Sequence, residues 1–173
     1  SSGVPLRWAA TTDRPGVAVV ADLSARVADE VGERVRRAKR PGDVAVVSIH
    51  WGSNWGYAVP RDQASFAHRL VEHGVDLVHG HSSHHPRPVE VHGDRLVLHS
   101  CGDFINDYEG ISGYERYRGD LRLLHLVRVA PGSGRLLGLR MVPFRSRRLR
   151  RERASEADTA WLGRTVDRIS RRY

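Results

Sequence analysis

The strongest constraint on the fold is a pair of short apolar runs that flank a helical pattern. The first run, residues 43–50, is rich in β-branched residues and has the length of a strand, as does the second, residues 75–79. Such runs are typical of strands buried on both faces, as in parallel sheets. Between them, Pro60 can open a helix and Gly74 can end it. The apolar face of that helix would consist of Ala64, Ala67, Leu70 and Val71. The order predicts a βαβ unit.

Two further helices are predicted by their caps and apolar spacing. Ser24 can cap a helix that Pro41-Gly42 closes, with Val27, Val31 and Val35 on one face at i, i+4 and i+8. Ser155 resembles the first residue of a capping box near the end of the chain. The inward face of this second helix would consist of Trp161, Leu162, Val166 and Ile169.

Between the βαβ unit and the last helix, the pattern changes to antiparallel pairs. Two hairpins are predicted, 89–100 with a turn at Gly93-Asp94 and 121–144 with a turn at 131–134. No internal repeat or low-complexity linker divides the chain. We therefore expect one α/β domain over residues 1–173. It would be a partial sheet-and-helix sandwich in which the βαβ unit precedes antiparallel strands and a C-terminal helix.

Composition limits where such a chain can act. No apolar run approaches the roughly 20 residues that span a bilayer, so we expect no transmembrane segment in this chain. No signal peptide is visible after Ser1, and the single cysteine, Cys101, excludes an internal disulfide framework. Location is left open between the cytoplasm and the cell envelope, and the oligomeric state is not predicted.

The basic charge of the chain is concentrated near its end. Of the formal net charge of +8, six units come from residues 145–173, and residues 145–153 contain six arginines. Such a run can contact phosphates, so a non-catalytic module that binds nucleic acid or another polyanion is the alternative function. A solvated connector is the simpler interpretation, because no nucleic-acid recognition motif accompanies the run. Nucleic acid is therefore an unlikely partner.

Histidines gather where the two predicted strands end. The chain has ten, six of them between His79 and His99. His50 closes the first strand, whereas His81 and His84 lie in a Gly/Ser-rich turn after the second. Carboxyl ends of neighbouring parallel strands meet at one sheet edge, and imidazole binds Zn, Fe and Mn. We predict a divalent metal site at His50, His81 and His84. His79, His92 and His99 are more simply explained as packing or partly exposed residues.

An aromatic cluster follows His50. Its members are Trp51, Trp55 and Tyr57. These rings are able to stack bases or sugars, or to wall the metal cleft, and the sequence does not choose between the two.

Three segments in fixed order carry a resemblance to a known family. They are His50-Trp51-Gly52, the run Gly74-Val-Asp-Leu-Val-His-Gly-His-Ser-Ser-His84, and Ser100-Cys-Gly-Asp-Phe104. Together they resemble the bacterial capsule-synthesis CapA family of poly-γ-glutamate synthesis proteins, which have a calcineurin-like metallophosphoesterase fold. The resemblance covers residues 43–109 closely and extends loosely to residue 145.

The resemblance implies a role for several residues. In the family's fold, a histidine after one strand and two histidines in a Gly-His loop contribute to a two-metal centre, which carries over to His50, His81 and His84. The family loop more often reads Gly-x-His-Pro-His, which leaves His81 as either a substitute ligand or a bystander. Asp103 stands where the family has an asparagine, and we expect it to support the ligands or to bind weakly. His84 and Asp103 are thus the candidate catalytic residues.

The resemblance also implies an activity. The parent protein would be a metal-dependent hydrolase of phosphoester or amide bonds in capsule or cell-envelope polymer synthesis, with Mn, Fe or Zn as cofactor. Its substrate would be the polymer or a small phosphoester or amide. The family's other ligands, Asp and Asn, come from strands that precede this region. We therefore expect this chain to be the C-terminal portion of the domain, with two metals in the full-length parent and little activity of its own.

Overall fold

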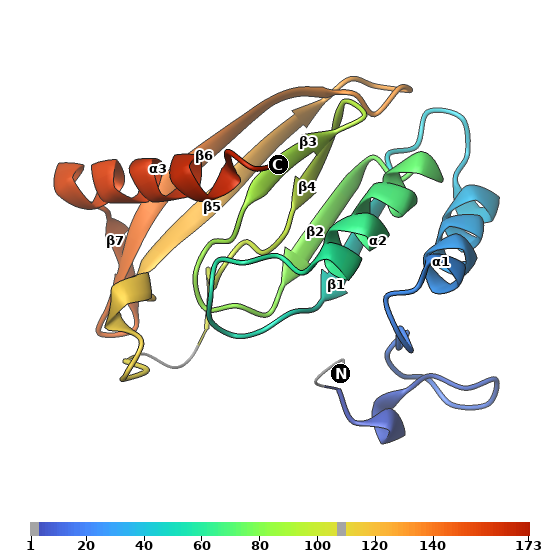
Figure 1. Cartoon of the computed structure of the whole chain (residues 1–173), viewed down its shortest axis with the longest axis horizontal. Coiled ribbons are helices and arrows are strands. Elements are labelled where there is room, and N and C mark those ends of the chain that lie inside the picture. Colours follow the sequence, from blue (N-terminus) through green and yellow to red (C-terminus); the bar gives the residue numbers. More distant parts are fainter. Residues whose placement is uncertain (1–3, 107–109) are drawn as a thin grey trace.

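The computed structural model describes residues 4–106 and 110–173, which form two β-sheets and three α-helices (Figure 1). The four-stranded sheet has the order β1-β2-β4-β3, and the three-stranded sheet has the order β5-β6-β7. The strands of the first sheet are β1 (Val46–His50), β2 (Leu77–His81), β3 (Val89–His92) and β4 (Arg95–Leu98). Those of the second sheet are β5 (Leu121–Val129), β6 (Leu136–Arg147) and β7 (Arg150–Arg153). The α-helices are α1 (Ala25–Ala38), α2 (Arg61–Glu72) and α3 (Glu156–Ser170), and short 3-10 turns cover Leu6–Trp8 and Glu115–Tyr117. The predicted α/β class is confirmed.

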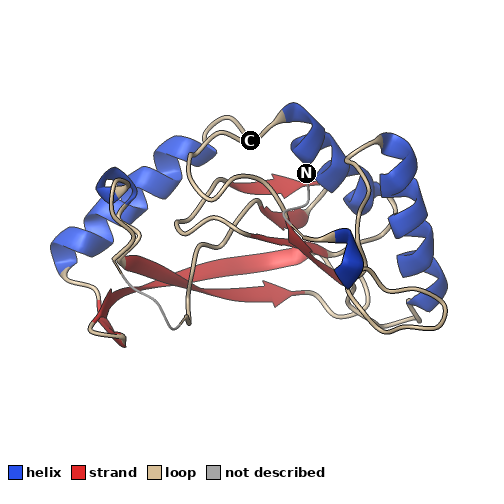
Figure 2. Cartoon of the chain, turned by 90° about the horizontal axis from the view of Figure 1, so that it is seen from below, coloured by secondary structure: helices blue, strands red, loops and turns tan. Residues whose placement is uncertain are grey.

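The βαβ unit is present, with β1 and β2 paired in parallel and α2 between them. Helices α1 and α2 cover one face of the four-stranded sheet and form a core with it, and Figure 2 shows the helices on one side of the strands. Members of this core include Val27, Ala28, Ile49, Phe66, Ala67, Leu70, Val78 and Val97. Ser24 caps α1 as predicted, because its Oγ accepts a hydrogen bond from the Val27 N–H at 3.4 Å.

Strand β1 differs from the prediction of a strand buried on both faces. It lies at the edge of the sheet, and Val46 is 55% exposed while Ile49 is buried. The reason is that α1 and α2 cover only the face to which Ile49 belongs. The opposite face of β1 carries Val46, Ser48 and His50, all exposed. Strand β2 also starts and ends two residues later than predicted, so His81 closes the strand and does not lie in the turn.

Both predicted hairpins form. At the β3–β4 turn, Gly93 and Asp94 have φ values of 53° and 60°, the left-handed pair that a tight hairpin turn requires. Strand β4 then runs parallel to β2, which places the hairpin in the first sheet. In the second sheet, β5 pairs with β6 along its whole length.

The C-terminal helix packs on the second sheet. Ser155 caps α3 by accepting the N–H of Asp158 at 3.1 Å, as the capping-box pattern predicted. Leu162 and Val166 form a second core with Leu121 and Leu123 of β5. Trp161 packs at the margin of this core.

The arginine run is exposed to solvent, as the prediction of a solvated connector implies, but it forms paired strands and not an irregular connector. Residues 147 and 150 pair across a tight turn, and the run forms the end of β6 and all of β7. Arg148 and Leu149 occupy the turn with φ values of 52° and 59°. Two arginines of β7 lie over aromatic rings, Arg151 over Phe104 and Arg153 over Phe144, so pairing and stacking order the segment.

Candidate functional site

His50 and His81 lie side by side where β1 and β2 end. They are partners in the parallel register, and their ring centroids are 5.2 Å apart at an interplanar angle of 71°. In-register parallel strands point paired side chains to the same face, which brings the two imidazoles together. Two of the histidines that were predicted to meet at this edge of the sheet, His50 and His81, are therefore in contact.

The rings around His81 favour its neutral form. Burial, followed by the neighbouring His50 and His79, lowers the pKa of His81, and burial lowers the pKa of His79. The His79 ring is 5.7 Å from that of His81, and its Nδ1 is 2.9 Å from the Ser48 hydroxyl. A neutral imidazole is the form that binds a metal ion. The lowered pKa therefore favours the form of His81 that a metal ligand needs.

The loop after β2 turns away from the strand end. Ser82 has a φ of 141°, a conformation that a residue with a side chain adopts only under strain. The His84 N–H then donates to the carbonyl of Asn54 at 3.1 Å, which fixes the loop against the segment that follows β1.

His84 and Asp103 are in direct contact. The His84 Nδ1 lies 3.0 Å from Asp103 Oδ2, and Arg122 Nη1 donates to the same oxygen at 3.1 Å. Because a carboxylate only accepts, the proton in the first contact is on the His84 Nδ1. Asp103 therefore orients the His84 ring, and the buried guanidinium of Arg122 orients Asp103 in turn.

The predicted aromatic cluster is divided by the fold. Trp55 stacks on Tyr114 with centroids 4.3 Å apart and also lies 5.2 Å from the His84 ring. Trp51 is instead a core residue, 5% exposed, whose indole N–H donates to the His99 carbonyl. Tyr57 packs against His85. Of the three, Trp55 is the one that lines a cavity at His84.

His85, which the sequence did not single out, holds this loop together. Its side chain is fully buried, and burial lowers its pKa to about 4. Its Nε2 accepts the Gly56 N–H at 3.1 Å and its Nδ1 contacts the Pro86 carbonyl at 2.9 Å. Both ring nitrogens are thus used, and His85 is a structural residue.

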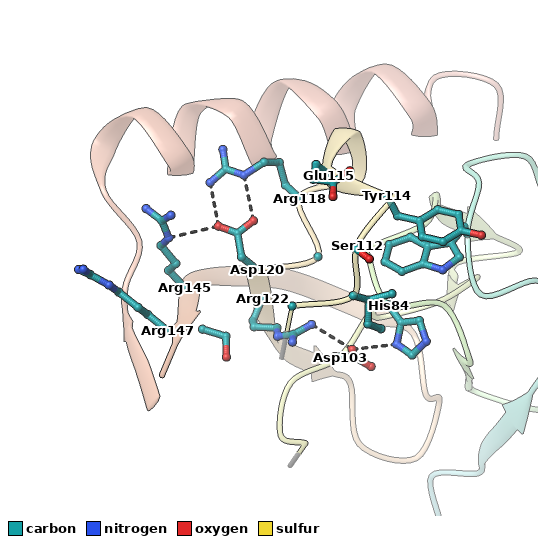
Figure 3. Close-up of a pocket in the computed structure, with 15 residues that line it drawn as sticks. His84, Asp103, Ser112, Tyr114, Glu115, Arg118, Asp120, Arg122, Arg145 and Arg147 are labelled. Carbon is teal, nitrogen blue, oxygen red and sulfur yellow. Dashed lines mark hydrogen bonds and ion pairs between the residues drawn. The ribbon is translucent and has the colours of Figure 1, made fainter. Parts of the chain in front are cut away.

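A cavity of about 490 Å³ opens beside the His84–Asp103 pair (Figure 3). Its lining comes from segments that are far apart in the sequence: Trp55, His84, Asp103, residues 110–112, Tyr114, Glu115, residues 118–120, Arg122 and residues 145–147. Four of these residues are arginines, against two aspartates and one glutamate. With His84 in its wall, the cavity suits an anionic ligand.

The arginines of the cavity are held by a network of carboxylates. Arg118 forms a two-pronged ion pair with Asp120 at 3.0 and 3.1 Å and reaches Asp158 at 2.8 Å. Arg145 contacts Asp120 at 3.2 Å. Figure 3 shows Arg147 at the far end of the cavity from His84. These pairs fix the guanidinium groups before any ligand arrives.

The four predicted site residues, which are the metal candidates His50, His81 and His84 and the catalytic candidate Asp103, form two pairs. The structure brings His50 to His81, and His84 to Asp103. Within residues 4–106 and 110–173, His50, His81 and His84 do not belong to a group of three ligand atoms that all lie within 4.8 Å of one another. The three-histidine assignment stays a prediction.

Sequence reasoning missed the arginines at the cavity. Arg122 lies in the first strand of the predicted hairpin, Arg118 precedes that hairpin and was given no role, and Arg145 was assigned to the arginine run. No local motif marks them, because they reach the cavity through the packing of the second sheet.

The chain is thus an α/β protein with two histidines paired at the ends of its parallel strands and, in the loop after β2, a third histidine that lines a cavity with four arginines. The chain belongs to the family described as bacterial capsule synthesis protein PGA_cap, which matches residues 1–108. The match includes His50, His81, His84 and Asp103, whereas all four arginines of the cavity lie after it.

Named relatives agree with the family. The chain is 55% identical over its whole length to a probable polyglutamine synthesis accessory protein of Mycobacterium tuberculosis, of which it covers 46%. It is 30% identical over 58% of its length to the PGA biosynthesis protein CapA of Bacillus subtilis, and covers 25% of that protein. The chain is also 28% identical, over 46% of its length, to the capsule biosynthesis protein CapA of Bacillus anthracis, and it covers 20% of that protein. The chain thus spans about half the length of the mycobacterial relative and a quarter or less of the length of the two Bacillus proteins.

Within the described residues, no helix is both long and apolar enough to cross a bilayer.

Proposed function

We propose that this chain forms the metal-binding and substrate-facing part of a protein of capsule or poly-γ-glutamate synthesis, with hydrolytic chemistry on phosphoester or amide bonds. Family membership and the names of the relatives support the pathway. The observation that carries the site is the His84–Asp103 contact in the wall of a cavity with four arginines. A polymer or precursor with carboxylate or phosphate groups matches that wall.

The strand-end histidines fit a divalent ion of the imidazole-binding class, Mn, Fe or Zn. His50 and His81 would bind it, with His84 as the predicted third ligand. Such an ion, when bound, activates a water molecule for attack on a phosphorus or carbonyl centre. Three neutral imidazoles are better suited to one metal ion than to two, because they carry no negative charge to offset the repulsion between two cations.

The residues of the chain have distinct tasks in this proposal. Asp103 holds the His84 ring in one orientation, so His84 is placed to exchange a proton with a group bound in the cavity. Arg118, Arg122 and Arg145, held by their carboxylates, provide oriented N–H donors for an anionic group, and Arg147 adds positive charge at the far end of the cavity. Trp55 and Tyr114 form a flat apolar wall on the other side.

Binding of polymer tests the charge of the cavity. Poly-γ-glutamate and uncharged polyglutamine would be titrated separately into the chain at low and high salt. We expect salt-dependent binding of poly-γ-glutamate and weaker binding of polyglutamine. Arg145→Gln together with Arg147→Gln should weaken poly-γ-glutamate binding several-fold, whereas the control Arg37→Gln, an exposed arginine of α1, should not. Equal losses in both variants would contradict the proposal.

Hydrolysis is tested in the full-length mycobacterial relative. A panel of phosphoester and amide substrates would be assayed with the wild-type protein and with alanine in place of the residue equivalent to His84. A large loss of turnover with unchanged metal content would support a proton-transfer role. Loss of metal in the same variant would instead support a ligand role, and unchanged turnover would exclude both.

The β6–β7 hairpin favours a second candidate function, polyanion binding without catalysis. Arg147, Arg148 and Arg150 are exposed around a shallow depression at its tip. A nucleic acid would be bound there through its phosphates, with strong dependence on salt. Tight, salt-dependent DNA binding that is lost in Arg148→Ser with Arg150→Ser would favour this function over the first.

A further inference from the structure

A second group of ligand-type side chains lies away from the cavity. One ligand atom from each of His68, Glu90 and His92 falls within 4.8 Å of the other two. His68 belongs to α2, and the other two belong to β3, the strand at the opposite edge of the sheet from β1. Figure 1 shows both elements.

The periodicities of a helix and a strand explain why these residues meet. Glu90 pairs with Val97, which belongs to the core covered by α1 and α2, so Glu90 points to the helical face of the sheet. His92 is two residues further and points the same way. On α2, His68 and Glu72 are one turn apart and share one flank. An i, i+4 pair on the helix thus faces an i, i+2 pair on the strand.

The contacts within the group are close. His68 Nε2 lies 2.6 Å from Glu90 Oε1, and His92 Nε2 lies 4.0 Å from Glu72 Oε1. The rings of His68 and His92 are parallel, with centroids 3.9 Å apart. Two imidazoles and a carboxylate therefore converge at a partly exposed position, with a second carboxylate in reach.

Glu90 is held in place from behind. Its side chain is largely buried, and its Oε2 lies 2.8 Å from Nε2 of the fully buried His99. The His99 Nδ1 has no partner among the described residues, so the ring proton is best placed on Nε2, where it is donated to Glu90. This contact uses one oxygen of Glu90 and directs the other to His68. Outer partners orient metal-binding carboxylates in the same way.

Glu90 is a buried carboxyl group between two imidazoles. Its Oε1 lies 2.6 Å from His68 Nε2 and its Oε2 lies 2.8 Å from His99 Nε2. Removal of a carboxylate from water is costly unless a positive partner accompanies it, and a bound cation would be such a partner.

We propose that His68, Glu90 and His92 bind one divalent transition metal ion, with zinc as the best match and Glu72 within reach as a fourth ligand. Two imidazoles and a carboxylate are a common zinc set that leaves a position for water or a further side chain. On binding, the His68 and His92 rings turn out of their parallel stack so that both lone pairs meet at the ion. The ion would join α2 to the edge strand β3.

This site is independent of the proposed function, because it shares no residue with His50, His81, His84 or the cavity. Its effect would be structural. An ion that binds only the folded chain raises the thermal midpoint with increasing metal concentration.

The test is metal titration of the whole chain with Zn²⁺ and, for spectroscopy, with Co²⁺. His92→Gln is the main variant, since this side chain is a third exposed at a sheet edge and its loss should not prevent folding. His68→Gln is the second. His73→Gln serves as a matched control, because His73 follows the same helix and also contacts a single carboxylate, that of Asp29.

The comparison is made in a His50→Gln, His81→Gln background, which removes the strand-end histidines as a second source of signal. In that background we expect visible Co²⁺ absorption and a zinc-dependent rise of several degrees in the thermal midpoint, both lost when His92→Gln or His68→Gln is added and kept when His73→Gln is added. If the background protein shows neither absorption nor a zinc-dependent rise, or if both persist after His92→Gln is added, the proposal is wrong and His68, Glu90 and His99 form only a structural hydrogen-bond network.

Discussion

His50 and His81 are register partners on adjacent parallel strands, and their rings meet edge to face at 5.2 Å. The contact joins residues that are separated by a helix and two loops in the sequence. It depends on both strands ending at the same level of the sheet, since a shift of one residue would send one ring to the opposite face.

This pair leads to a prediction about metal affinity. His81→Gln should weaken binding of Zn²⁺ or Mn²⁺ at the strand ends by about tenfold or more, because it removes one imidazole ligand of the ion. A tenfold change corresponds to a loss of about 1.4 kcal/mol of binding free energy. The measurement is calorimetric titration in a His92→Gln background, so that the second site does not contribute. His73→Gln in the same background is the control. Unchanged affinity in His81→Gln would show that His81 is a bystander.

The sequence predicted most of the elements but not all of their surroundings. Caps at Ser24 and Ser155, the turn at Gly93-Asp94 and the parallel pairing of β1 with β2 follow from local rules that the structure obeys. The exposure of Val46 does not follow, because apolar β-branched residues indicate a strand but not which of its faces is covered. Local pattern carries no information about which element lies on the other side.

The candidate site was predicted in part for the same reason. His84 and Asp103 were both selected, and they are in contact. Arg122, which completes that contact from β5, was not, because its place depends on how the second sheet packs. The fragment Arg145 to Arg153 was read by its charge alone, whereas pairing between β6 and β7 decides its form.

Asp103→Asn should destabilise the chain and disorder His84. The carboxylate accepts from both His84 and the buried Arg122, and the amide would leave Arg122 without a negative partner. We expect a loss of about 1–3 kcal/mol in the free energy of unfolding, measured by urea denaturation. Glu115→Gln, an exposed residue at the same cavity, is the control and should change stability little. Similar stability of Asp103→Asn and wild type would show that Arg122 is satisfied by other groups.

Stability should fall in acid partly through Asp29. Hydrogen bonds from Arg69 and His73 lower the pKa of Asp29 from 3.8 to about 2, so the folded chain binds this proton less readily than the unfolded chain. Its contribution is therefore present above pH 3.8 and is lost as the pH falls through about 2. Asp29→Asn should flatten the pH dependence of unfolding in that window. Arg69→Gln should have a similar effect, and an unchanged slope in both variants would contradict this account.

Cys101 should be inert in the folded protein. Burial raises the pKa of its thiol to about 12, so only about one part in ten thousand is thiolate at pH 8, and the thiolate is the reactive form. A chromogenic disulfide reagent should react slowly with the native chain and rapidly in denaturant. Fast reaction of the native chain would show that the segment around Cys101 opens frequently.

The last prediction concerns catalysis by the 173-residue chain itself. We expect weak binding of a transition metal at the strand-end histidines and negligible phosphoesterase or amidase activity. His50, His81 and His84 are neutral ligands, and within the described residues no carboxylate joins any two of them in a three-ligand group. Two divalent cations a few ångströms apart repel strongly unless negative ligands lie between them. The measurements are metal content by mass spectrometry and turnover on a substrate panel, for this chain in the His92→Gln background and for the full-length mycobacterial relative. Two tightly held ions with full turnover in this chain would show that the ligand assignment is wrong.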